Sequence, residues 1–210
     1  MSGETQIEIE RKYDVDADTP LPNPVGAGTI AVVEPPQTIE LDATYFDTAE
    51  LDLARHATAL RRRSGGEDAG WHIKRAVDEG RTEQHWPLAE GESAGTVVPG
   101  SLRADVAQVI GERELIPVAR VRNRRVVSRL LDAARYPVAE LCDDHVVADD
   151  LLSGEHRTWR EWEIELLAAA PDTRAERTAL LDELESVVIA VGGRVSSSSS
   201  KVARALGVQE

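Results

Sequence analysis

Charged and apolar residues alternate along several short segments of the chain, the first of which is IEIERKYDV, beginning at residue 7. Successive side chains of a β-strand point to opposite faces, so Glu8, Glu10 and Lys12 share one face of this segment. Because Glu and Lys are poor strand formers, a face made of them needs an explanation. It either faces water, where its charges protect a sheet edge from aggregation, or it has a chemical role. The segment alone does not decide between the two.

Five more segments alternate in the same way, at residues 59–63, 70–76, 81–88, 138–147 and 159–167. The polar face of the first segment contains Arg61 and Arg63, that of the second His72 and Lys74, and that of the third Arg81, Glu83 and His85. The polar face of the fourth contains Glu140, Cys142 and Asp144, and that of the fifth Glu161, Glu163 and Glu165. Residues 117–131 predict another strand pair or one long strand, in which arginines are so numerous that the inward face cannot be identified. Turn-forming residues at 64–70, 78–80 and 134–137 separate these segments.

Helical periodicity is confined to fewer segments. Apolar residues recur at helical spacing in 171–193, a segment that begins with Pro171 and ends with Gly192 and Gly193. Shorter helices are predicted at 48–57 and 99–112, and a short helix or turn follows the serine run at 196–200. No internal repeat or linker divides the chain. We therefore expect one domain over residues 1–210, with a strand-rich core at about 5–167 and a C-terminal helical segment at about 171–206.

Composition narrows the class of protein. The 210 residues are 41% hydrophobic but only 4% aromatic, which predicts a core built mainly from Val, Leu, Ile and Ala. The net charge of −14 argues against a general nucleic-acid binder or a polybasic membrane-surface protein. There is no apolar run of membrane-spanning length and no signal peptide, and the single Cys142 excludes an internal disulfide framework and a cysteine-based zinc site. We expect a cytoplasmic protein.

The alternating segments predict an α+β fold with a closed antiparallel sheet. Their charged faces contain both signs in quantity, and the predicted helices can cover the apolar faces. A barrel with a charged interior and helices packed on the outside fits this pattern, and its interior would be a ligand tunnel. Carboxylates in such a tunnel can hold a divalent cation through oxygen ligands, and Arg and Lys can hold a polyanion such as phosphate.

The sequence EIERK at residues 8–12 resembles the Glu-x-Glu-x-Lys signature of the CYTH superfamily, also called triphosphate tunnel metalloenzymes. Further similar stretches follow in order along nearly the whole chain, namely YFDT, LRRR, HIKR, RTEQH, PVARVRNRR, AELCDD, EIEL and SSK. Only three of the 24 basic residues are lysines, and Lys12, Lys74 and Lys201 all fall on these stretches. The resemblance implies a closed eight-stranded antiparallel tunnel that binds a triphosphate and requires Mg²⁺ or Mn²⁺ for turnover. In a chain of 210 residues we do not expect the helical domain that usually follows this tunnel.

The resemblance also implies roles for individual residues. The triphosphate would be bound by Lys12, Arg61, Arg63, Lys74, Arg125 and Lys201. The metal would be bound by Glu8, Glu10, Asp144, Glu163 and Glu165. The expected catalytic residues are Glu8, Glu10 and Lys12, and further candidates are Arg81, Glu83, Arg122, Glu140 and Glu161. Two choices stay open, between Arg122 and Arg125 and between Asp143 and Asp144, although only Asp144 shares its face with Glu140.

The implied reaction is in-line attack on a terminal phosphoryl group, with the divalent ions orienting the phosphates and activating the attacking water. A purely structural network of buried ion pairs is the alternative explanation of these charges, and it is a poor way to gain stability. We expect His72 and His85 to be packing or hydrogen-bonding residues, Tyr45, Phe46 and Asp47 to be structural, and Cys142 to be a small interior residue.

Three functions compete. The leading one is a metal-dependent hydrolase of inorganic triphosphate. The second is a class IV-type adenylate cyclase or a thiamine triphosphatase, although no nucleobase pocket can be identified in the sequence. The third is a non-catalytic polyphosphate or nucleotide binder, which predicts affinity without metal and no turnover. The expected partner is a small triphosphate rather than nucleic acid or a membrane, and a homodimer is left open.

Overall fold

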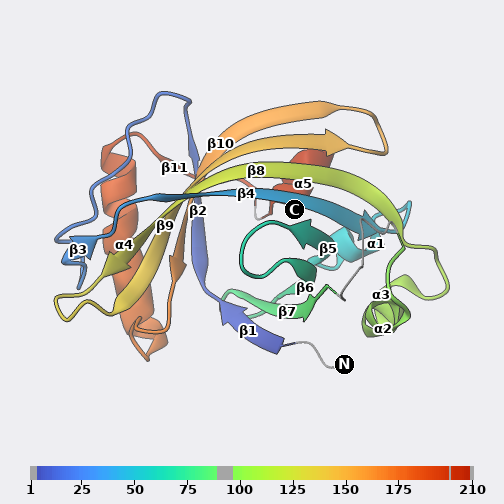
Figure 1. The fold of residues 1–210 in the computed structure, drawn as a ribbon, viewed down its shortest axis with the longest axis horizontal. Coiled ribbons are helices and arrows are strands. Elements are labelled where there is room, and N and C mark those ends of the chain that lie inside the picture. The colour runs from blue at the N-terminus through green and yellow to red at the C-terminus, as the bar shows by residue number, and fades with distance from the viewer. Residues whose placement is uncertain (1–3, 89–96, 199, 209–210) are drawn as a thin grey trace.

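The computed structural model describes residues 4–88, 97–198 and 200–208. Within these described residues, eleven strands form one antiparallel sheet (Figure 1). They are β1 (Glu4–Glu8), β2 (Glu10–Val15), β3 (Val32–Val33), β4 (Gln37–Asp47), β5 (Thr58–Ser64), β6 (Gly70–Ala76), β7 (Arg81–Pro87), β8 (Ile116–Leu131), β9 (Pro137–Asp150), β10 (His156–Leu166) and β11 (Arg194–Val195). The helices are α1 (Asp52–Arg55), α2 (Gly100–Asp105), α3 (Ala107–Ile110), α4 (Arg174–Ala190) and α5 (Lys201–Leu206).

The sheet is strongly curled but open, with the strand order β1-β7-β6-β5-β4-β8-β9-β10-β2-β11 and with β3 paired to β8 off this path. The expected closed barrel of eight strands is therefore wrong in its closure and strand number. The reason lies at Ile9, where the N-terminal segment changes partners. Before this residue β1 pairs with β7, and after it β2 pairs with β10. One segment thus forms the first strand of this order, β1, and also β2 beside the last strand, β11, but its pairing is interrupted between them.

Most of the predicted strands are confirmed, and residues 117–131 belong to one long strand, β8, rather than to a pair. Strand β4 was not predicted. It pairs with β5 on one side and with β8 on the other, so it lies in the middle of the sheet. Its position makes it a central wall of the concave face.

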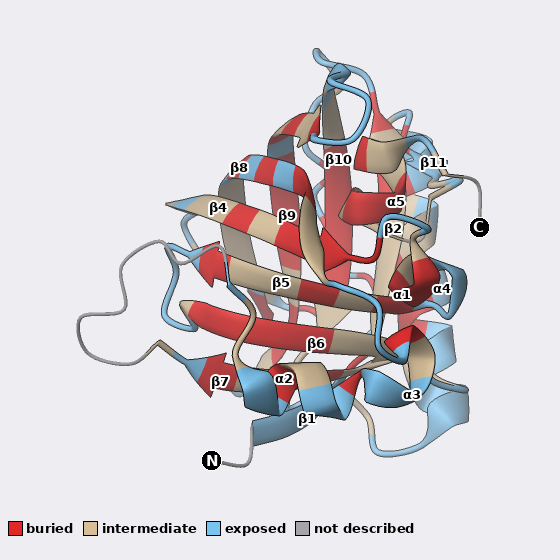
Figure 2. Cartoon of the chain, turned by 90° about the vertical axis from the view of Figure 1, so that its right-hand side faces the viewer, coloured by how far each residue is buried: buried red, intermediate tan, exposed pale blue. Residues whose placement is uncertain are grey.

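Helices α1, α2, α3 and α4 pack on the convex side of the sheet, as expected, and α1 contributes the fully buried Leu53. Helix α4 presents an apolar stripe of Leu180, Leu181, Leu184 and Val188 to β2, β9 and β10, and Trp162 is fully buried beneath it. Helices α2 and α3, which lie beside β6 and β7 (Figure 2), contribute Leu102 and Ile110 to a second core over β5, β6 and β7, and Val106 between the two helices joins it.

Helix α5 departs from the expectation that all helices lie outside. Its Val202 and Ala205 pack with Ala43, Tyr45 and Val121, three residues that line the concave face. Small apolar side chains allow this short helix to approach the inner surface of the sheet closely. Among the described residues, no helix is both long and apolar enough to cross a membrane.

Candidate functional site

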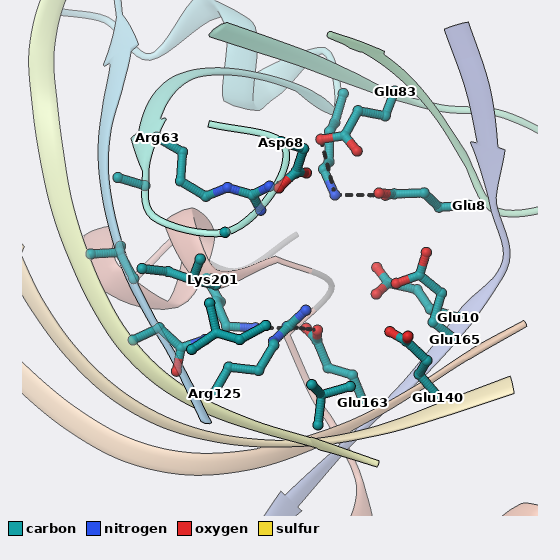
Figure 3. Close-up of a pocket in the computed structure, with 18 of the residues that line it drawn as sticks. Glu8, Glu10, Arg63, Asp68, Glu83, Arg125, Glu140, Glu163, Glu165 and Lys201 are labelled. Carbon is teal, nitrogen blue, oxygen red and sulfur yellow. Dashed lines mark hydrogen bonds and ion pairs between the residues drawn. The ribbon is translucent and has the colours of Figure 1, made fainter. Parts of the chain in front are cut away.

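The concave face of the sheet encloses a cavity of about 590 Å³ (Figure 3). Every second residue of the N-terminal segment lines it, namely Gln6, Glu8, Glu10 and Lys12. The alternation of faces is thus kept across the change of partners at Ile9. The charged face of the opening segment points into this cavity and not into bulk water.

One group of charges is centred on Glu83 of β7, which is only 2% exposed. Its carboxylate accepts hydrogen bonds from Arg61 at 3.2 Å and from His72 Nδ1 at 2.8 Å, and Lys74 Nζ lies 3.4 Å away. Burial opposes ionisation of Glu83, but His72 and Lys74 outweigh it and hold its pKa well below the usual range. Lys74 also donates to Glu8 at 2.6 Å. Glu83 therefore holds the side chains of β5 and β6 in place.

A second group is centred on Glu163 of β10. Lys201 Nζ lies 2.6 Å from Glu163, and Lys12 and Arg125 also pair with this carboxylate. Burial raises the pKa of Glu163, but these three cations outweigh it and hold the pKa well below its usual value. Arg125 grips Asp144 with two hydrogen bonds of 2.8 and 2.7 Å, the fork geometry that also suits a phosphate group.

Four carboxylates lie on the side of the cavity opposite Arg63, Arg125 and Lys201. Figure 3 shows these carboxylates, which belong to Glu8, Glu10, Glu140 and Glu165. We call them the acidic row.

Burial raises the pKa of Glu8 to about 7, against the attraction of Lys74, and the neighbouring Glu83 adds to the rise. Burial also raises the pKa of Glu165 to about 7, with Glu10 and Glu163 adding to the rise. Burial is the largest cause of both rises, so the ionised forms of Glu8 and Glu165 are disfavoured here, and a nearby cation would favour them. Hard oxygen ligands in this state fit a divalent cation such as Mg²⁺ or Mn²⁺.

Two other clusters bring potential metal ligands within 4.8 Å of one another. They are Asp68, His72 and Glu83, and Asp144, Glu161 and Glu163. Both are already neutralised by the cations of the cavity. Lys201 Nζ alone lies 2.6–2.8 Å from all three carboxylates of the second cluster. The acidic row also contains ion pairs, from Lys74 to Glu8 at 2.6 Å and from Lys12 to Glu10 at 2.9 Å. The pKa values of Glu8 and Glu165 nevertheless stay raised, which makes this row the better candidate for the metal.

The structure gathers most of the predicted site residues. All six predicted triphosphate-binding residues line the cavity. Of the predicted metal ligands, Glu8, Glu10, Glu163 and Glu165 line it, whereas Asp144 is fully buried behind Arg125 and Lys201. The further candidates Arg81, Glu83 and Glu140 also line the cavity.

Two of the further candidates do not line the cavity. Arg122 lies on the opposite face of β8, where it is exposed and pairs with Asp149 at 2.7 Å, so the structure favours Arg125. Glu161 lies behind Lys201, and its Oε1 atom is 2.6 Å from Lys201 Nζ. Asp143, the alternative to Asp144, is also turned away, since it accepts hydrogen bonds from Arg160 and from the indole of Trp162.

Other residues of the site were not predicted. Tyr45 was expected to be structural, but it lines the cavity and its hydroxyl accepts a hydrogen bond from Arg61 at 3.4 Å. Asp68, which pairs with Arg63, and Asn123 line it too. The alternation of residues 37–47 could have indicated that Tyr45 faces the cavity, because it places this residue on the same face of the strand as Ala43.

The structural roles expected nearby are confirmed by the contacts. Asp47 accepts hydrogen bonds from the backbone N–H groups of Leu53 and Ala54 at 2.8 and 3.0 Å, which fixes the start of α1. The ring of Phe46 packs against Trp71 with centroids 5.3 Å apart, on the side away from the cavity.

Comparison with solved structures finds the same fold in other proteins. A Bacillus halodurans protein provisionally named an adenylate cyclase has a TM-score of 0.62 at 20% identity, over 95% of this chain and 97% of that one. A Hippeastrum protein provisionally named an adenylyl cyclase, whose dominant activity is described as that of a triphosphatase, has a TM-score of 0.53 at 20% identity, over 96% of both chains. At this identity the likeness shows the fold.

Sequence comparison gives nearer relatives. Two Mycobacterium tuberculosis proteins, from the CDC 1551 / Oshkosh and H37Rv strains and both named as uncharacterized, are 38% identical to this chain. The match covers 96% of this chain, which spans about 40% of the length of these curated relatives. Residues 6–189 match the CYTH domain. This match covers most of the sequence and all but one of the predicted site residues, and the chain therefore belongs to the CYTH domain family.

Proposed function

We propose that the cavity binds a small triphosphate, with inorganic triphosphate as the leading substrate, and hydrolyses it with the help of Mg²⁺ or Mn²⁺. The observation that carries this proposal is the separation of charge across one cavity. Cations from β5, β8 and α5 face the carboxylates of the acidic row across a space of about 590 Å³. The family relationship agrees with a triphosphate ligand.

The cations are suited to hold an extended chain of phosphates. Arg61 and Arg63 reach the cavity from β5, Arg125 from β8 and Lys201 from the start of α5. The Nε atoms of Arg61 and Arg63 are buried and have no hydrogen-bond partner among the described residues. Guanidinium groups bind phosphate oxygens in pairs, and a buried donor without a partner favours an acceptor in the cavity.

The acidic row would hold the metal. Glu8, Glu10 and Glu165 supply carboxylate oxygens on the side of the cavity across from Arg125 and Lys201. A divalent ion bound there would neutralise phosphate oxygens and lower the pKa of a bound water. The residues of the chain then orient the triphosphate so that a water oxygen attacks the terminal phosphorus in line. The anhydride bond breaks, and the products are orthophosphate and pyrophosphate.

The test measures phosphate, pyrophosphate and cyclic AMP released from inorganic triphosphate, thiamine triphosphate and ATP, with Mg²⁺ or Mn²⁺ and with EDTA. Glu10→Gln removes one charge from the acidic row. Glu40→Gln is its matched control, because Glu40 lies exposed on the outer face of β4. We expect metal-dependent phosphate release from inorganic triphosphate that falls by about 100-fold or more in Glu10→Gln and is unchanged in Glu40→Gln.

Other outcomes would contradict the proposal. Cyclic AMP and pyrophosphate from ATP would identify a cyclase. Triphosphate binding that survives EDTA, without turnover of any of the three substrates, would identify a binding module. Equal losses in the two Glu variants would show that the acidic row has no special role.

A further inference from the structure

The cavity has a wall that a bare triphosphate does not need. Where β4 and β8 pair, the side chains that face the cavity are mostly apolar, in contrast to the charged faces of the other strands. This apolar floor consists of Ile39, Leu41, Ala43, Val121 and Val127. Apolar surface gains nothing from contact with phosphate oxygens, whereas it favours the burial of an organic group.

On β8 the apolar floor is interrupted by Asn123 and Arg125, and Gln37 lies beside it on β4. Asn123 lies directly opposite Leu41 in the register of β4 and β8, and Val146 of β9 is its partner on the other side. The residue is only 5% exposed, and its Oδ1 atom has no hydrogen-bond partner among the described residues. Buried amides normally have partners, because an unsatisfied polar atom in an apolar environment destabilises the fold. The amide thus has a capacity for hydrogen bonding that the fold does not use.

The position of this amide connects it to the proposed phosphate site. Asn123 is two residues from Arg125 on the same face of β8, so the two side chains are neighbours. On the other side of the floor, Arg63 of β5 lies opposite Ala43 of β4. A ligand whose anionic end is held by Arg63 and Arg125 would therefore place an attached group over the floor, within reach of Asn123.

The cavity volume agrees with such a ligand. About 590 Å³ lies within the usual range of roughly 300–1,000 Å³ for pockets that enclose organic ligands. A few placed polar groups within an apolar lining are the usual source of orientation and selectivity in such pockets.

We propose that Asn123 is a specificity-determining residue, whose amide binds a hydrogen-bonding group on an organic moiety esterified to the triphosphate. Asn123 would then determine how well the site distinguishes a triphosphate monoester, with an apolar face and a hydroxyl or amino group, from inorganic triphosphate. This inference rests on the triphosphate binding of the proposed function and not on the hydrolysis. It names a property of the cavity that the charged residues alone do not determine.

The test compares Asn123→Leu with the wild type, because Leu is close to Asn in size and removes only the polar atoms. The values of kcat/KM are measured for ATP, thiamine triphosphate and inorganic triphosphate with Mg²⁺ and with Mn²⁺. We expect a loss of about 10- to 100-fold for the ester that the wild type uses best, and a change of less than about threefold for inorganic triphosphate. The melting temperature should stay equal or rise, because the variant removes an unsatisfied buried amide.

Asn123→Ala is the second variant, in case Leu is too bulky for the floor. Calorimetric titration of ATP and of inorganic triphosphate in EDTA measures recognition without turnover. Parallel losses for all substrates, or a lower melting temperature with unchanged substrate ratios in both variants, would show a structural role and overturn the inference.

The two proposals fail in different ways. If the wild type hydrolyses inorganic triphosphate but neither binds nor hydrolyses the two esters, the inference about Asn123 is wrong and the proposed function stands. If the wild type hydrolyses none of the three, the proposed function is wrong. Selective loss of ATP binding in the Asn123 variants would then still support the inference.

Discussion

Lys201 offers the sharpest test of how the buried charges hold the site together. Its ammonium lies 2.8 Å from Asp144, 2.6 Å from Glu161 and 2.6 Å from Glu163. The side chain of Lys201 is 11% exposed, and its three partners are at most 5% exposed. Burial lowers the pKa of Lys201, but the carboxylates outweigh it and raise the pKa well above its usual value. The ammonium is therefore charged at neutral pH, and its removal leaves carboxylates with less compensation.

The magnitude follows from what stays behind in Lys201→Met. Removing one partner of a buried ion pair costs about 3–5 kcal/mol. Arg125 still contacts Asp144 and Glu163 in the variant, and the indole of Trp159 still donates to Glu161 at 2.6 Å. We therefore expect the lower end, about 3 kcal/mol of unfolding free energy at pH 7. For a chain of this size, that corresponds to a fall in melting temperature of roughly 6–12 °C.

The assay is urea unfolding at pH 7 together with thermal melting, with Arg122→Met as the matched control. Arg122 pairs with Asp149 at 2.7 Å, nearly the same distance, but its side chain is 44% exposed. We expect this exposed pair to contribute less than about 1 kcal/mol. The cost of Lys201→Met should also shrink as the pH falls toward 5, because the carboxylates left behind can take up protons.

The reasoning is refuted if the two variants lose equal stability, since burial would then make no difference to the ion pair. A Lys201→Met variant as stable as the wild type, with an unchanged urea dependence, would refute it as well.

Two further predictions concern the acidic row and the phosphate-binding cations. Without metal, stability should fall between pH 5 and 8, because Glu8 and Glu165 have pKa values of about 7 in the folded chain against 4.5 in the unfolded one. Their contribution is complete below pH 4.5 and is lost as the pH rises through 7, by at most about 3 kcal/mol for each group. The melting temperature should depend less on pH when both residues are changed to Gln. A wild-type melting temperature that rises between pH 5 and 8 would contradict the raised pKa values of Glu8 and Glu165. Arg125→Gln should weaken triphosphate binding by about 10- to 100-fold in calorimetry, whereas Arg124→Gln, on the outer face of the same strand, should leave it unchanged. Equal effects of these two changes would argue against a site on the inner face.

Much of the site could be predicted because charge and alternation occur together in its strands. Glu8, Lys74 and Glu163 each stand on a polar face whose opposite side is apolar, and the period of two then places them inside. The same criterion cannot show which face of β8 lines the cavity, because Arg122 and Arg125 lie on opposite faces and both faces contain arginine. Only the pairing of β8 with β4 and β9 shows which of them faces the cavity.

Strand β4 could not be found by a search for charged inner faces. Its inward residues Ile39, Leu41 and Ala43 are apolar, and its charged residues Glu40 and Asp42 face outward, as in an ordinary half-buried strand. The apolar floor cannot be found by that search either, because its residues are not charged. The open sheet was also beyond prediction, because nothing local at Ile9 signals that the chain exchanges β7 for β10.

The net charge of the chain and the charge of its cavity act on different ligands. The whole chain has 24 basic and 38 acidic residues, whereas the cavity lining contains nearly as many basic as acidic side chains. The excess of negative charge therefore lies mainly elsewhere, where it repels a long polyanion that must contact the outer surface. The short triphosphate proposed as the ligand would meet Arg61, Arg63, Arg125 and Lys201 at close range inside the cavity, and a buried charge is screened less than an exposed one. This distribution of charge would let an acidic chain repel nucleic acid at its surface and still bind the proposed triphosphate within its fold.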